Sequence, residues 1–184
     1  MKKHYVLYTI LILSISCRNN KQDNNNPTQM HLNVELNETN LGNKADSIDF
    51  SSISRLTQAQ YDSMQIRNIE DINVYEPKDF SMGRILFNEK NGKLLTVQII
   101  TEGEITEYLL SYNNEGKLMD NLLVAYEDLV EYYSQISTTI KSNEIAVQTI
   151  TFNYEDADEN SSESADTVIV NYQITPDLKF VLNK

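Results

Sequence analysis

One polar segment near the C-terminal end of the chain concentrates acidic side chains. Residues 155–166 hold six acids and no base. Asp156, Asp158 and Asn160 have the one-three-five spacing of the oxygen ligands in a calcium-binding loop. The sixth position, where such a loop needs glycine, is a serine, and the twelfth is a threonine instead of a glutamate. Because neighbouring carboxylates also repel one another, the segment is most typical of a solvated hairpin loop. A weak calcium site and a docking loop for a basic partner are the alternatives.

Other chemistry-bearing residue types are sparse. The chain has one Cys and two His, and residues 46–184 contain neither. Cys–His and Ser–His–Asp nucleophilic sites and His-ligated transition metals are therefore excluded from that region. Asp, Glu, Tyr and Lys remain for acid–base work. Since the acids are spread over turns and polar faces, we expect no catalytic residue and no cofactor, and a carboxylate-based hydrolase is the minor alternative.

The overall charge restricts the class of partner. The 184 residues include 15 Lys and Arg against 27 Asp and Glu, for a formal net charge of −12. Such a chain repels phosphate, so we expect no nucleic-acid partner. The length suits a single domain, and an apolar content of 40% is enough for a folded core.

The one cysteine lies at the end of an N-terminal apolar run. Lys2 and Lys3 precede the apolar residues 5–15, and Ser16 and Cys17 follow. A basic start, a short apolar stretch and a small residue before a cut site predict a secretory signal peptide over residues 1–16. About 20 apolar residues are needed to span a bilayer as a helix, so this run is too short for a permanent transmembrane segment.

Residues 13–17, Leu-Ser-Ile-Ser-Cys, resemble a bacterial lipobox whose leucine lies one place further from the cysteine than usual. With the Asn- and Lys-rich residues that follow, they are similar to the small envelope lipoproteins of Bacteroidota, a group of uncharacterised function. The resemblance implies cleavage before Cys17 and lipid attachment to it, which makes the membrane a partner. More than one acyl chain holds a protein at a membrane almost irreversibly. Residues 18–23 lack the acidic pattern that directs some such lipoproteins to the cell surface, so we expect the outer membrane, facing the periplasm. A soluble secreted protein with an incidental Cys17 is the alternative.

Three regions follow from composition. The signal peptide is succeeded by an Asn-rich tether over residues 17–45, in which a short strand at residues 32–36 is the alternative to disorder. Residues 46–184 form a single β-rich domain. Within it, residues 54–72 are the best helix candidate, with Thr57 as its cap.

From residue 82 onward the apolar residues recur with a period of two. Asn91–Gly92 and Asn113–Gly116 are hairpin signals. The sequence therefore predicts an antiparallel up-and-down meander of about eight strands, forming a rolled sheet or open barrel, with a flat helix-covered sheet as the alternative. The apolar residues of 129–140 also fit a helical face. The expected strands cover residues 83–87, 94–101, 105–112, 118–126, 129–140, 145–154, 166–174 and 178–182.

These features favour a non-catalytic domain that binds or scaffolds another envelope protein or a glycan. This hypothesis predicts a contiguous exposed apolar or Tyr patch. A lipocalin-like carrier of small ligands would instead need a deep apolar pocket in a closed barrel. A hydrolase would need two acids close together in a cleft.

Overall fold

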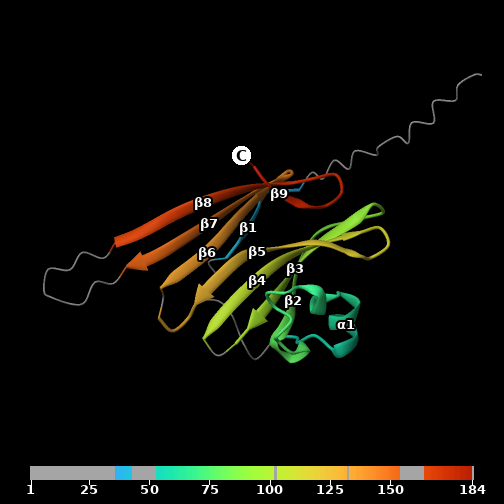
Figure 1. Ribbon diagram of the computed structural model, residues 1–184, viewed down its shortest axis with the longest axis horizontal. Helices are drawn as coiled ribbons and strands as arrows, with labels where there is room; N and C mark the ends of the chain where they lie inside the picture. The colour runs from blue at the N-terminus through green and yellow to red at the C-terminus, as the bar shows by residue number, and fades with distance from the viewer. Residues whose placement is uncertain (1–35, 43–52, 102, 132, 154–163, 184) are drawn as a thin grey trace, which may run out of the picture.

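The computed structural model describes residues 36–42, 53–101, 103–131, 133–153 and 164–183. The domain is mainly β, and its centre is one nine-stranded antiparallel sheet that does not close into a barrel. Strands β2 to β9 follow one another across the sheet in chain order, which confirms the predicted meander (Figure 1). Their bounds are β2 (Phe80–Glu89), β3 (Gly92–Ile100), β4 (Glu104–Asn113), β5 (Leu118–Asp128), β6 (Ser134–Lys141), β7 (Glu144–Asn153), β8 (Ser164–Ile174) and β9 (Phe180–Leu182).

The turns explain where the strand predictions succeed and where they fail. Gly116 has a φ of 77°, which confirms the predicted glycine turn between β4 and β5. The expected strands 118–126 and 129–140 leave residues 127–128 as a turn, which is wrong, because β5 continues to Asp128. The Asp128 carboxylate accepts hydrogen bonds of 2.9 Å from the backbone N–H groups of Val130 and Glu131 and so places the turn after itself. Strand β6 consequently starts at Ser134 and not at residue 129.

The predicted helix over residues 54–72 is much shorter in the structure. Helix α1 covers Gln58–Ser63, and Thr57 caps it as expected through a reciprocal pair of hydrogen bonds with Gln60. The helix ends because Gln65 adopts a left-handed φ of 57° while its side chain bonds the backbone of the β4–β5 turn. A short 3-10 helix, Ile66–Asn68, follows. No helix in the described part of the chain is long and apolar enough to cross a membrane.

A short strand, β1 (Thr39–Leu41), lies within the predicted tether and pairs with β6. Strands β5 and β6 pair only at Tyr126–Ile136 and Glu127–Gln135, and β1 takes the place beside β6 where β5 diverges. Leu36 and Leu41 are buried in the core, which explains why this segment joins the fold. Residues 36–42 therefore belong to the domain, which corrects the expected start of the domain at residue 46.

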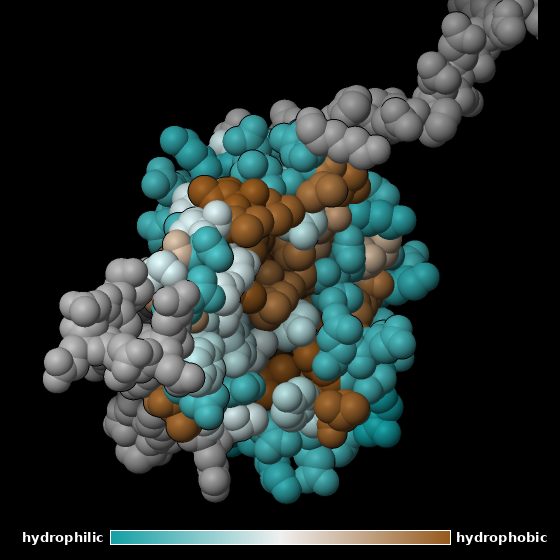
Figure 2. All heavy atoms as spheres, turned by 60° about the vertical axis from the view of Figure 1, so that its left-hand side comes forward, coloured by the Kyte–Doolittle hydropathy of each residue, from teal (hydrophilic) through white to brown (hydrophobic). Residues whose placement is uncertain are grey.

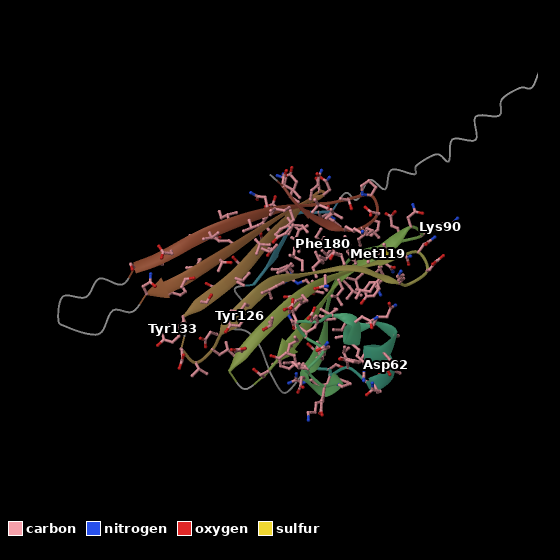
Figure 3. The ribbon with its side chains drawn as sticks, viewed as in Figure 1. Asp62, Lys90, Met119, Tyr126, Tyr133 and Phe180 are labelled. Atoms are coloured by element: carbon pink, nitrogen blue, oxygen red, sulfur yellow. The ribbon has the colours of Figure 1, made fainter. Side chains whose placement is uncertain are left out.

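Two hydrophobic cores lie on opposite faces of strands β2 to β5. The first is covered by α1 and the residues that follow it, and the second by β1 and β6 to β9, which curve over the other face (Figure 1). The curvature brings β9 back to the start of β5, where the Phe180 N–H donates to the Asp120 carboxylate at 2.8 Å. Met119 and Phe180 pack on the second core from these two strands (Figure 3).

Candidate functional site

Four residues singled out by the sequence lie outside the described residues. These are Cys17, the predicted site of lipid attachment, and the weak calcium candidates Asp156, Asp158 and Asn160. Both assignments stay predictions. The described residues instead present an open sheet edge, two surface depressions and a buried acid.

The outer edge of β8 is the open edge of the sheet. Strand β8 pairs with β7 along its whole length, from Asn153–Ser164 to Glu144–Gln173. On its other side, β9 pairs only with Tyr172–Ile174, and the Asn183 N–H donates to the Asn171 carbonyl at 2.8 Å. Among the described residues, no strand pairs with the outer edge of residues 164–170. Their outward N–H and C=O groups can therefore accept another strand.

Apolar side chains flank this edge on both faces of β8. Val168 and Ile169 are each 58% exposed, and since successive residues of a strand point to opposite faces, they lie on either side of the sheet. Val181 and Leu182 of the neighbouring β9 are about half exposed as well. Figure 2, in which the left side of Figure 1 comes forward, shows that apolar side chains reach the surface of the domain among polar ones.

The opposite edge of the sheet, on β2, is partly covered by the protein itself. The Leu56 N–H donates to the Phe80 carbonyl at 2.9 Å, and Arg55 pairs with Ser81 as an isolated bridge. Further along β2, the Arg84 guanidinium donates to the Asn40 carbonyl of β1 at 2.9 Å. The two edges of the sheet thus differ: described residues contact the β2 edge at Phe80, Ser81 and Arg84, whereas on β8 none pairs with the outer edge of residues 164–170.

Two larger depressions lie on the outside of the domain. One, of about 650 Å³, is lined by residues of α1 and of the loop before β2, and there the Arg67 guanidinium lies over the Tyr61 ring, 5.8 Å from its centroid. The other, of about 290 Å³, lies at the β2–β3 hairpin beside Tyr112, whose hydroxyl donates to the Met64 carbonyl at 2.8 Å. Burial raises the Tyr112 pKa well above its ordinary value. Both depressions have mixed polar and apolar walls, unlike the apolar calyx of a small-ligand carrier.

Glu107 is an acid buried within the sheet, with 5% of its surface exposed. It stands in a transverse row in which Ser81 of β2, Gln98 of β3 and Glu107 of β4 are direct neighbours. The Gln98 amide donates to one carboxylate oxygen at 3.4 Å, while the other oxygen, Oε1, has no hydrogen-bond partner. Glu107 is not among the residues predicted above, although its alternation with Ile105 and Leu109 is a sequence signal for this burial.

A cavity of about 20 Å³ adjoins Glu107, which is room for one water molecule. Glu127 and Tyr126 of β5 also line it. Burial, helped by a hydrogen bond from the Tyr126 hydroxyl to the Glu104 carboxylate, raises the Tyr126 pKa to about 12, so this phenol is neutral near pH 7. Two acids thus meet at a site too small for a sugar substrate. Within the described ranges, no group of three or more His, Cys, Asp and Glu side chains is placed to hold a metal ion.

Comparison with known proteins adds no relative: no family model, curated protein or solved structure matches this chain.

Proposed function

We propose that this protein is a lipid-anchored envelope protein whose β-domain binds an extended segment of another polypeptide along the outer edge of β8. Attachment through Cys17 rests on the lipobox resemblance. The binding role rests on one observation, the unpaired edge of residues 164–170 with Val168 and Ile169 exposed beside it.

Strand addition suits this edge physically. The backbone N–H and C=O groups of residues 164–170 supply the hydrogen bonds, and the exposed apolar side chains on both faces supply contact area and specificity. A formal charge of −12 repels acidic partners and attracts basic ones. The segment that fits best is therefore an extended stretch of β-forming residues flanked by Lys or Arg, supplied by a second envelope protein.

The alternatives have less structural support. A lipocalin-like carrier needs a closed barrel around an apolar cavity, whereas this sheet is open and both faces of β2 to β5 are packed with side chains. A carboxylate hydrolase needs a cleft for its substrate, whereas Glu107 and Glu127 adjoin only a cavity of about 20 Å³.

Photocrosslinking in the native membrane tests the binding role. We would replace Ile169 on the edge, and in a separate variant the 78% exposed Val74 of the α1 side, with a photoreactive phenylalanine analogue. We expect a crosslinked product from position 169 whose attached peptide is basic and β-forming, and none of that product from position 74. Identical products from both positions, or no product from position 169, would contradict the proposal.

A charge introduced beside the edge, compared with the same charge introduced elsewhere, provides a matched control. Val168→Lys places a charge beside the unpaired edge, as natural proteins do to block strand addition, and its exposure leaves the core untouched. We expect Val168→Lys to reduce the crosslinking yield from position 169 at least fivefold, whereas Val74→Lys should leave that yield unchanged. An equal reduction by both substitutions would assign the effect to overall charge and count against an edge-specific interaction.

A further inference from the structure

The unpartnered oxygen of Glu107 is exceptional among the buried polar groups of the described residues. The side chains of Thr96, Ser111 and Thr138 each have a partner at 2.6 to 2.8 Å, and Ser81 bonds Gln98 at 3.5 Å. Only Glu107 Oε1 has none. Since a buried ionised carboxylate is costly unless it is paired or coordinates a metal, this oxygen indicates a missing partner.

Among the described residues that line the cavity, Glu107 and Glu127 carry negative charge and none is a base. The register of β4 and β5 places Ala125 opposite Glu107 and Glu127 opposite Ile105. Glu107 and Glu127 are therefore diagonal neighbours on one face, about 7 Å apart at their Cα atoms. The two ion pairs between described residues, Lys78–Glu76 and Lys141–Glu38, involve neither acid.

Two acidic residues and one amide residue, from three neighbouring strands, line the cavity. Glu107, Glu127 and Gln98 all line it, and it has room for one water-sized occupant. Two carboxylates balance the charge of one divalent cation. We propose that this pocket binds a single calcium-sized cation through the carboxylates of Glu107 and Glu127.

Calcium fits the pocket better than magnesium does. Ca²⁺ accepts irregular sets of carboxylate, amide and water oxygens, whereas Mg²⁺ demands near-octahedral geometry and usually keeps several waters. A cavity of about 20 Å³ has no space for a hydrated Mg²⁺ ion. The bound cation would join the adjacent strands β4 and β5.

Terbium luminescence tests the site in the full-length protein solubilised in detergent. Tb³⁺ replaces Ca²⁺ at oxygen sites and emits when a nearby tyrosine is excited. Tyr126, whose position on β5 is labelled in Figure 3, is one of the residues that line this cavity. We expect saturable emission that Ca²⁺ displaces and Mg²⁺ at equal concentration does not. Glu107→Gln should weaken Tb³⁺ binding at least tenfold, and Tyr126→Phe should remove the emission while Ca²⁺ still raises the melting temperature.

The acidic segment at residues 155–166 provides the decisive control. A variant carrying both Asp156→Asn and Asp158→Asn should keep the emission, because those residues are not part of the proposed pocket. Retention of emission in Glu107→Gln together with its loss in the double variant would overturn the proposal.

Thermal unfolding separates cation binding from a folding defect. Ca²⁺ should raise the melting temperature of the wild type and leave that of Glu107→Gln unchanged. In calcium-free buffer Glu107→Gln should be at least as stable as the wild type, since it removes a buried charge. If Glu107→Gln fails to fold, the half-buried Glu127→Gln replaces it, and an undiminished calcium response in that variant would count against the site.

Discussion

At the scale of single residues, Tyr112 connects the two layers of the domain. Its ring lies in the first core and its hydroxyl donates to the Met64 carbonyl at the end of α1. Tyr112→Phe removes that hydrogen bond and leaves a buried carbonyl unpaired, which should lower the free energy of unfolding by about 1 to 2 kcal/mol. Urea unfolding at pH 7 measures this loss of stability. Tyr172→Phe is the control, since in the described part of the chain its hydroxyl has no hydrogen-bond partner.

Tyr112→Phe should also change how the stability of the fold depends on pH. Because burial raises the Tyr112 pKa, the folded state keeps the phenol proton at pH values where the unfolded chain, with a pKa near 10, loses it. The contribution of Tyr112 to stability is therefore complete below about pH 10 and is lost as the pH rises above that value. Stability measured from pH 9 to pH 11 should fall less steeply for Tyr112→Phe than for the wild type. Parallel curves would show that Tyr112 does not titrate in this way.

Gly83 allows a close approach between β2 and β3. A Cβ atom there would overlap Thr96 Oγ1 and lie 2.9 Å from the Thr96 carbonyl oxygen. Thr96 cannot easily move, because its Oγ1 accepts the Arg84 N–H at 2.8 Å. Gly83→Ala should therefore destabilise the fold by about 1 to 3 kcal/mol in urea unfolding. In Gly103→Ala the added Cβ would contact only the end of the exposed Val130 side chain, so this substitution should lower the free energy of unfolding much less.

The candidate site was only partly predictable from residues. The parity of Glu107 with Ile105 and Leu109 indicates burial, but its unpaired oxygen depends on the register of three strands and on Gly42 beside the cavity. Those contacts join positions far apart in the sequence. The open edge of β8 was equally hidden, because the predicted last strand at 178–182 gave no sign that its pairing stops at Tyr172.

At the scale of elements, local signals predicted the meander well. Asn- and Gly-containing turns and period-two alternation are read within a few residues, so the order and approximate bounds of β2 to β9 follow from them. The length of α1 could not be predicted from local signals. Ile66, Ile69 and Ile72 are all buried and continue the helical pattern past Gln65, whose left-handed φ the pattern does not indicate. Strand β1 is too short to give a periodic signal, and only its pairing with β6 defines it.

Strand β1 makes a testable contribution to the fold. Leu41 is 1% exposed in the second core, so Leu41→Ala should lower the free energy of unfolding by about 2 to 5 kcal/mol. Asn37→Ala, on the exposed stretch before β1, should change it by less than about 0.5 kcal/mol. Chemical denaturation of both variants measures the difference. If Leu41→Ala lowered the free energy of unfolding only slightly, residues 36–42 would belong to the tether and not to the folded domain.

At the scale of the whole molecule, the open edge and the acidic charge act together. An exposed apolar edge can pair with a strand of any chain, whereas a formal charge of −12 repels other copies of this protein, so the proposed partner is basic. Raising the salt concentration screens exposed charges, so the crosslinking yield at position 169 should fall between low and high ionic strength. A yield that rises with salt would indicate an apolar contact without charge complementarity.

The proposed place of this domain at a membrane depends on the predicted lipid attachment to Cys17, and the mass of the mature protein tests that attachment most directly. We predict that protein extracted from the membranes of its native cell begins at Cys17 and carries the added mass of acyl chains. We further predict that Cys17→Ala abolishes this mass and releases the protein from the membrane fraction. A mature protein with an unmodified Cys17 thiol, or membrane retention unchanged by Cys17→Ala, would contradict the account.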